Sequence, residues 1–280
     1  MRDFANDHSA LALNTATLGH NLEGQGAGWS PERVIDACAE RGYGGLVFWR
    51  REIGDRAVEI GDRVRASGMQ VAGLCRTPYL TGREAGSDDE IRSSVDMAAA
   101  LGAEVLTIVT GGTDPETVGL DETLDRLADR LVLHVEYAAK CDVKLALEPL
   151  NPMFGGNRTC LMTVQDTLEI RDRIGASNLG IAVDVYHVWW DRSLPESLQG
   201  AFGHVFGYHL CDWLENTSDM LLDRGMMGDG VADLKAIRRE VEKTGYSGLC
   251  EVEVFSAENW WKRPPDEVLD VIVDRFRAVC

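Results

Sequence analysis

The amino-acid sequence predicts an α/β fold, a (β/α)₈ TIM barrel that forms a single domain over residues 1–280. Three observations support this prediction. Short apolar segments alternate with amphipathic segments about eight times along the chain, which is the number of repeats that closes such a barrel. The apolar segments are mostly continuous, as expected for parallel strands covered on both faces. No linker, charge block or low-complexity segment divides the chain.

The expected strands are short and rich in Val, Ile, Leu and Ala. In chain order they are Leu11–Asn14, Gly45–Phe48, Gln70–Leu74, Glu104–Val109, Lys144–Leu147, Leu179–Val183, Val205–Leu210 and Leu249–Val254. The alternative arrangement is an open, doubly wound sheet. A nucleotide-binding version of that sheet has little support, because no Gly-rich phosphate-binding sequence follows the first strand.

The segments between the strands have the period of amphipathic helices. Leucines recur every three or four residues from Leu120 to Leu131, and Leu234, Ile237 and Val241 show the same spacing. Ser30 followed by Pro31 is a typical helix start. Glycines stand where four of the helices are expected to end, namely Gly42, Gly68, Gly102 and Gly245.

Composition excludes several classes of function. The chain carries 46 acidic and 28 basic residues and a formal net charge of −18, which argues against nucleic acid and against an anionic membrane surface as partners. No segment is apolar for the ~18 residues that a membrane helix needs, and the N-terminus lacks the pattern of a signal peptide. Seven cysteines without a CxxC pair indicate reduced thiols and a cytoplasmic protein.

Ionisable residues close the last four expected strands. They are Glu148, Asp184, His209 and Glu253. The carboxyl ends of the strands of a TIM barrel meet at one mouth, so these side chains are expected to converge there. Burying such charges costs several kcal/mol unless a counter-charge is present. The set therefore predicts one divalent metal ion, with Mn²⁺ expected and Mg²⁺, Co²⁺ or Zn²⁺ as alternatives.

The same region resembles the xylose-isomerase-like sugar isomerases and epimerases, a family that includes bacterial inosose isomerase and ketose 3-epimerases. The resemblance covers nearly the whole chain and is densest after Leu145. It is carried by Leu147-Glu148-Pro149, by Asp184 with His187, by His209 with Asp212, by Asp223-Arg224 leading into Gly228-Asp229-Gly230, and by Val252-Glu253-Val254-Phe255 followed by Asn259-Trp260.

The resemblance implies a role for each matching residue. Glu148, Asp184, His209 and Glu253 would bind the metal, and Glu148 and Glu253 would also move protons as catalytic residues. His187 and Arg224 would contact substrate oxygens, and Asp212 would orient the substrate or brace a loop. The implied enzyme is a metal-dependent isomerase or epimerase of a small keto-sugar or inosose, which transfers a proton through a metal-stabilised cis-enediolate.

The eighth strand carries two candidate carboxylates. Glu251 and Glu253 are two residues apart and face the same side of the strand, so periodicity does not choose between them. The resemblance selects Glu253. Glu251 would then lie one layer deeper in the barrel and need a partner, either Lys144 or a metal ligand.

Other readings of the site remain open. A lyase subunit that cleaves 3-oxo-glycosides, including C-glycosides, begins with the same proton abstraction. Asn151 stands where such relatives often have a His, and this disfavours reactions that need that His. An endonuclease IV-like enzyme and an inactive barrel used as a binding module are further alternatives. A chelator and metal analysis would separate the binding module from an enzyme.

The expected partners are a small carbohydrate substrate and further copies of the chain in a homo-oligomer, with a small partner subunit as an option. The loops after the last two strands contain several acidic residues and tryptophans, so the substrate is expected to be a neutral polyol carbonyl and not a sugar phosphate. His20 and Arg76 follow the first and third strands and are further candidates for the pocket.

Overall fold

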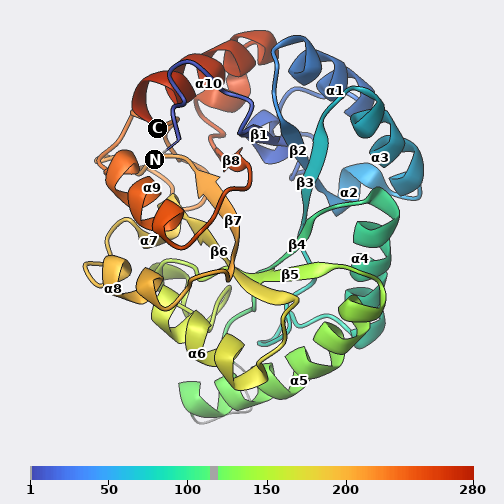
Figure 1. Cartoon of the computed structure of the whole chain (residues 1–280), viewed down its shortest axis with the longest axis vertical. Helices are drawn as coiled ribbons and strands as arrows, with labels where there is room; N and C mark the ends of the chain where they lie inside the picture. The colour runs from blue at the N-terminus through green and yellow to red at the C-terminus, as the bar shows by residue number, and fades with distance from the viewer. Residues whose placement is uncertain (1, 114–118) are drawn as a thin grey trace.

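Eight parallel strands form a closed barrel in which each strand pairs with the next along the chain and the last pairs with the first (Figure 1). This arrangement is seen in a computed structural model that describes residues 2–113 and 119–280. The strands are β1 (Leu11–Asn14), β2 (Gly45–Trp49), β3 (Gln70–Cys75), β4 (Val105–Ile108), β5 (Lys144–Leu147), β6 (Leu179–Asp184), β7 (Val205–Leu210) and β8 (Cys250–Val252). The predicted barrel is confirmed, and the open sheet is excluded.

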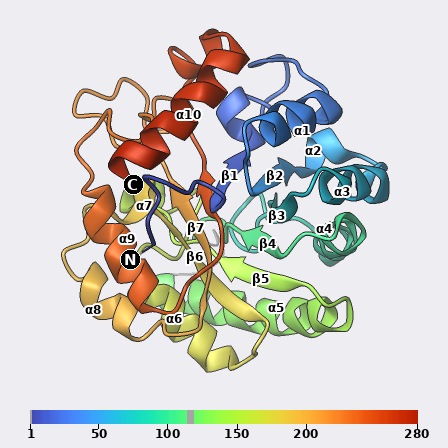
Figure 2. The same cartoon turned by 45° about the horizontal axis from the view of Figure 1, so that its top comes forward.

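Helices form a ring around the barrel (Figure 2). The longer ones are α1 (Pro31–Glu40), α3 (Ala57–Ala66), α4 (Asp88–Leu101), α5 (Leu120–Lys140), α6 (Val164–Ile174), α9 (Leu234–Lys243) and α10 (Pro265–Val279). Short helices lie in the loops, namely η1 (Thr15–Leu18), α2 (Arg50–Ile53), η2 (Pro152–Phe154), α7 (Val185–Val188), α8 (Leu194–Gln199) and η3 (Trp260–Lys262). Within the described ranges, no helix has both the length and the apolar character needed to cross a membrane.

The predicted helix boundaries follow local chemistry. The Ser30 side chain accepts the backbone N–H of Arg33 at 3.4 Å, which begins α1 as expected. The four glycines expected at helix ends all have positive φ, a conformation that suits glycine at a helix terminus. These local signals therefore set the lengths of the repeats.

A small apolar cluster lies inside the barrel, one layer below the ionisable residues at its mouth. Ala146 and Ala182 cluster with Val105, and Phe206 packs against them. One layer higher, Asp184 is paired in register with His209, and His209 is paired with Glu251. The strand pairing thus brings ionisable groups from three neighbouring strands to the same level of the barrel.

Gly180→Ala should destabilise the barrel. A Cβ at this position on β6 would lie 2.5 Å from both the carbonyl oxygen of His204 and the ring of Phe206, so backbone and side chain would have to shift. We expect the free energy of unfolding to fall by about 1–3 kcal/mol. Urea denaturation measures this. Gly200→Ala is the control, because its nearest contacts would be 3.4 Å away or more. Equal stability of the two variants would contradict the prediction.

Candidate active site

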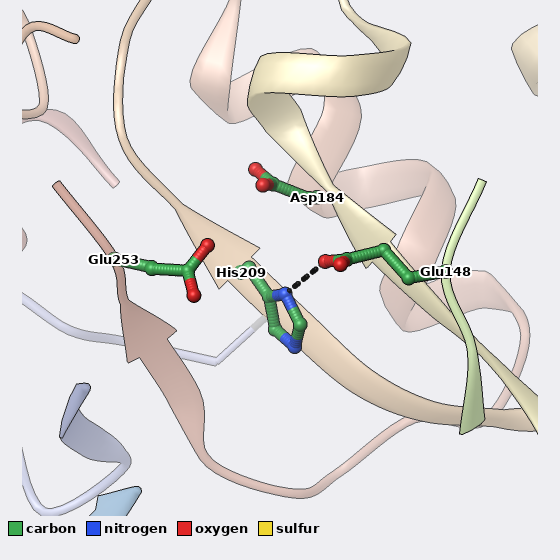
Figure 3. A group of neighbouring side chains, drawn as sticks. All are labelled: Glu148, Asp184, His209 and Glu253. Atoms are coloured by element: carbon green, nitrogen blue, oxygen red, sulfur yellow. Dashed lines mark hydrogen bonds and ion pairs between the residues drawn. The ribbon is translucent and has the colours of Figure 1, made fainter. Parts of the chain in front are cut away.

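Four buried side chains converge at the carboxyl-terminal mouth of the barrel. Glu148 follows β5, Asp184 ends β6, His209 lies near the end of β7, and Glu253 follows β8. Their exposed fractions are 6%, 0%, 2% and 5%, respectively. One ligand atom from each lies within 4.8 Å of the ligand atoms of the others. Figure 3 shows the four side chains directed towards a common centre.

His209 connects two carboxylates through its two ring nitrogens. Nδ1 faces the centre and lies 2.8 Å from Glu148 Oε1 (Figure 3). Nε2 lies 3.2 Å from Glu251 Oε2. A ring whose Nε2–H donates to Glu251 presents the lone pair of Nδ1 to the centre. This is the arrangement in which a carboxylate orients a metal-binding histidine.

Glu251 takes its partners from inside the barrel. Besides His209, its Oε1 accepts a hydrogen bond from Asn14 Nδ2 at 2.6 Å. Lys144, one of the two expected partners, instead lies with its ammonium 5.6 Å from the centre of the Phe206 ring. The prediction of a Lys144–Glu251 pair is therefore wrong, because Lys144 stands at the opposite end of the barrel interior, at the start of β5.

Asn14 is a site residue that sequence reasoning missed. Its Nδ2 donates to Glu251 and also to Glu253 Oε1, at 2.9 Å. Its Oδ1 accepts the indole N–H of Trp49 at 2.9 Å, which fixes the amide so that the NH₂ group faces the carboxylates. The available signal was an amide side chain that ends the first apolar strand at the barrel mouth.

Arg224 is the buried cation of the site. Its Nη1 donates to Asp184 Oδ2 and to Glu253 Oε2, each at 3.1 Å. The guanidinium lies between the rings of Tyr186 and Phe255, 4.3 Å from each centroid. The backbone N–H of Arg224 donates to the Phe255 carbonyl at 2.8 Å, so the loops after β7 and β8 are joined at this point. The structure therefore places Arg224 inside the candidate site.

His187 reaches the site from α7, directly after β6. It is buried, and its Nδ1 accepts the backbone N–H of Asn151 at 3.2 Å, which leaves the proton on Nε2. Nε2 lies 3.6 Å from Asp184 Oδ2 and lines the cavity above the cluster. Burial lowers the pKa of His187 well below its ordinary value, and Arg224 adds to this shift. A neutral His187 can donate a hydrogen bond to a substrate oxygen.

Asp212 has a structural role, the second of its two expected roles. Its Oδ1 accepts the backbone N–H groups of Trp213 and Ala232, and its Oδ2 accepts those of Gly228 and Gly230, at 2.9–3.0 Å. All four bonds hold together the loop that carries Arg224, and substrate binding by Asp212 stays a prediction.

The electrostatics of the cluster reflect several carboxylates in one buried layer. Burial raises the pKa of Asp184, and the charge of Glu148 adds to this shift while Arg224 opposes it. Burial also raises the pKa of Glu251, and it raises the pKa of Glu253 to about 8. For His209, burial lowers the pKa, but Glu251 and Glu148 together raise it well above its ordinary value.

A cavity lies directly above the cluster. Its apolar walls include Trp49, Phe154, Leu221 and Phe255. Two arginines, Arg76 and Arg158, also line it. Arg76 was a candidate in the sequence, whereas Arg158 was missed because it lies in a loop beyond η2 and not at a strand end.

Other candidates lie outside this cavity. His20 pairs with Glu52 at 2.9 Å and lines a separate surface pocket beside Trp29. Trp189 and Trp213 contact each other with tilted rings, their centroids 5.5 Å apart, and Trp261 packs against Phe255. These tryptophans support the walls of the site from behind.

A buried set of carboxylates and one imidazole at the mouth of a (β/α)₈ barrel defines an enzyme-type TIM barrel with a candidate metal centre. The chain belongs to the family of Xylose isomerase-like TIM barrels, which it matches over residues 35–277.

Two curated relatives carry names of sugar-converting enzymes. The inosose isomerase of Bacillus subtilis (strain 168) is 27% identical over 184 residues, and the match spans 64% of each chain. The alignment thus covers slightly less than two thirds of that relative. The fructoselysine 3-epimerase of Escherichia coli O157:H7 is 25% identical over 271 residues, which cover 89% of this chain and 93% of the relative.

Two solved structures share the fold over nearly the whole chain. A crystal structure of a protein from Sinorhizobium meliloti 1021 is 38% identical with a TM-score of 0.89, and the match covers 98% of this chain and 99% of the other. The structure of the IOLI protein with a bound zinc atom is 20% identical with a TM-score of 0.80. The match covers 96% of this chain and 99% of the IOLI chain.

Asp212→Ala should destabilise the loop that carries Arg224, because four backbone N–H groups lose their acceptor at once. We expect a loss of about 3 kcal/mol in the free energy of unfolding. The control is Asp233→Ala, which removes only the cap at the start of α9 and should cost about 1 kcal/mol. Chemical denaturation of both variants compares them. A smaller loss for Asp212→Ala than for the control would contradict the bracing role.

Proposed function

We propose that the protein is a divalent-metal-dependent isomerase or epimerase of a small keto-sugar or inosose. The observation that carries the proposal is the convergence of Glu148, Asp184, His209 and Glu253 within 4.8 Å at the mouth of the barrel. The names of the two curated relatives, an inosose isomerase and a 3-epimerase, support the same class of reaction.

The residues at this site fit a divalent cation. Four buried carboxylates, those of Glu148, Asp184, Glu251 and Glu253, lie around two buried basic groups, the guanidinium of Arg224 and the imidazole of His209. Without a further positive charge, burial and mutual repulsion favour protonated carboxyls, which is the reason for the raised pKa values of three of them. A dication reverses this preference. Oxygen ligands with one imidazole suit Mn²⁺, and the zinc in the IOLI structure makes Zn²⁺ the alternative to test.

Bound at this centre, the cation would polarise a substrate carbonyl and stabilise the negative charge that develops when the neighbouring carbon loses a proton. Side chains of the protein then remove and return the proton. Glu148 and Glu253 approach from β5 and β8, so one can remove the proton and the other can return it to the opposite face or to the adjacent carbon.

Three further residues hold the reacting groups in place. His187 and Arg224 line the cavity and can donate hydrogen bonds to substrate oxygens. Glu251 acts on His209 and not on the substrate, because its oxygens are engaged by Nε2 of that histidine and by the amide of Asn14. We therefore assign proton transfer to Glu148 and Glu253 and the positioning of His209 to Glu251.

The local structure at Asn151 disfavours the lyase alternative. Its Oδ1 accepts the backbone N–H of Met153 at 3.2 Å and caps η2, and its own N–H donates to His187. An amide does not gain or lose a proton at ordinary pH, so it cannot replace the acid or base that such a lyase needs at this position.

Metal dependence is the first test. Chelator-treated protein should show no exchange of substrate hydrogen with solvent, and Mn²⁺ or Co²⁺ should restore it. A panel of keto-sugars and inososes incubated in D₂O and followed by mass spectrometry detects proton abstraction even when no product accumulates. Full exchange in the presence of chelator, with no metal found by elemental analysis, would overturn the proposal.

Glutamate variants separate catalysis from metal binding. At Mn²⁺ concentrations that saturate each variant, Glu148→Gln and Glu253→Gln should still lower deuterium incorporation by at least about 100-fold, since each loses a proton-transfer group. Glu251→Gln should weaken Mn²⁺ binding about 10-fold or more, through loss of the charge that orients His209, and should recover activity at high Mn²⁺. Calorimetric titration of Mn²⁺ into each variant makes the comparison. Loss of turnover in Glu251→Gln with unchanged metal affinity would reverse the assignment on β8.

The metal-free protein should lose stability as pH rises from 4.5 to about 8. In this window folded Glu253 keeps its proton, whereas the unfolded chain has released it. The stability contributed by this proton is therefore complete below pH 4.5 and is lost as pH approaches 8. Mn²⁺ competes with the proton, so it should raise the Tm more at pH 8 than at pH 5. Glu253→Gln should reduce the slope of the metal-free profile, to which Asp184 and Glu251 still contribute, and an unchanged slope in this variant would contradict the assignment.

A further inference from the structure

The cavity above the acidic cluster has a basic wall. The expectation of a neutral substrate rested on the loops after β7 and β8, which are acidic and rich in tryptophan. The positive side chains come instead from the loops after β3 and β5, where Arg76 and Arg158 line the same cavity as Glu148, His187 and Glu253.

Arg76 is held in place by its neighbours but forms no ion pair. Its guanidinium stacks over the Tyr79 ring, 4.2 Å from the centroid, and one nitrogen donates to the carbonyl of Thr77 at 3.0 Å. No carboxylate forms an ion pair with it in the described part of the chain. Burial lowers the pKa of Arg76, and the charge of Arg158 lowers it further, whereas the charge of Glu148 opposes this shift. The two cations are thus close enough to repel each other.

Arg158 is anchored through its backbone. Its N–H donates to the Phe154 carbonyl at 3.0 Å, and its carbonyl accepts the N–H of Gly111 at 3.1 Å, so the loops after β4 and β5 support it together. The guanidinium lies 5.7 Å from the centroid of the Phe154 ring. Among the described residues it has no hydrogen-bond acceptor and no ion-pair partner.

Arg76 and Arg158 line a cavity without forming ion pairs, although the chain is rich in carboxylates. Acidic residues outnumber basic ones by 46 to 28, and arginines on the outer helices pair with them readily, as Arg63 does with Asp36 and Arg173 with Asp125. Two guanidinium groups that line one cavity and form no ion pair can hold an anion from outside the chain, because a planar guanidinium pairs with carboxylate or phosphate oxygens through two parallel hydrogen bonds.

We infer that Arg76 and Arg158 form an anion-binding subsite, and that the substrate is a keto-sugar that bears a carboxylate or a phosphate away from its reacting carbonyl. The inference rests on the proposed function for the reaction at the other wall of the cavity. The acidic cluster repels an anion, so a negatively charged end is directed to the arginines and the carbonyl end to Glu148 and Glu253. This replaces the expectation of a neutral substrate.

Three ketoses that differ at one carbon test the inference. D-fructose, D-fructuronate and D-fructose 6-phosphate share the carbonyl end and carry a hydroxymethyl, carboxylate or phosphate group at C6. Calorimetric titration into chelator-treated and into Mn²⁺-loaded protein should show that at least one anionic probe binds about 10- to 100-fold more tightly than D-fructose. The probe with the larger preference identifies carboxylate or phosphate as the anionic group.

Matched variants assign the preference to the two arginines. Arg76→Gln and Arg158→Gln should each remove most of the affinity difference between the anionic probe and D-fructose. Arg76→Lys and Arg158→Lys should keep part of this difference because the charge remains. Arg63→Gln, on the outside of α3, is the control and should keep all of it. Unchanged melting temperatures exclude unfolding as the cause. Equal affinity for the three probes, no binding by any of them, or a preference that survives both Gln variants would overturn the inference.

The two proposals fail in different ways. If the anionic probes bind through the arginines but no ketose exchanges hydrogen with D₂O, the subsite stands and the proposed reaction falls. If neutral ketoses exchange hydrogen and both Gln variants leave affinity and exchange unchanged, the reaction stands and the anion-binding subsite falls.

Discussion

Burying several carboxylates in one layer of the barrel is the constraint on which the rest of the site depends. Glu148, Asp184, Glu251 and Glu253 are each less than one-tenth exposed. Charges buried in this way must be compensated by hydrogen bonds, ion pairs or a bound cation. The surrounding residues supply part of this compensation, through the amide of Asn14 below and the guanidinium of Arg224 above. The remainder is the charge that a divalent ion would provide.

The fold keeps these groups in place by stiffening what lies around them. Parallel pairing sets Asp184, His209 and Glu251 at one level, so their separation is fixed by the backbone. Arg224 lies on a loop, which is a less rigid support, but Asp212 gathers four N–H groups of that loop. Two aromatic rings then hold the guanidinium between them. A mobile Arg224 would lose most of its value as a counter-charge, because an ion pair weakens once its geometry varies.

The sequence predicts the barrel and the central cluster because both follow from short-range patterns. Continuous apolar runs mark parallel strands, and a carboxylate or imidazole that closes such a run lies at the mouth of the barrel. Contacts between distant segments leave no such pattern. Asn14 reaches Glu251 across 237 positions, and Arg158 gains its place in the cavity from a loop that follows a short helix. The predicted pairing of Lys144 with Glu251 is wrong for a related reason. The sequence does not show how far apart residues of different strands lie along the barrel axis, and Lys144 stands at the start of its strand.

The charges of the cavity are separated in a way that bears on selectivity. Acidic groups form its floor, around the four converging residues, and the two unpaired arginines stand in its wall. A neutral ketose forms no ion pair with the arginines, so charge does not fix the direction in which it enters. A ketose with one negative end is repelled by the floor and attracted by the wall, so only one orientation is favourable. That orientation brings the carbon beside the carbonyl to Glu148 and Glu253. Fixing the substrate in this way lowers the entropic cost of proton transfer, so binding energy at the remote end can contribute to the rate at the reacting end.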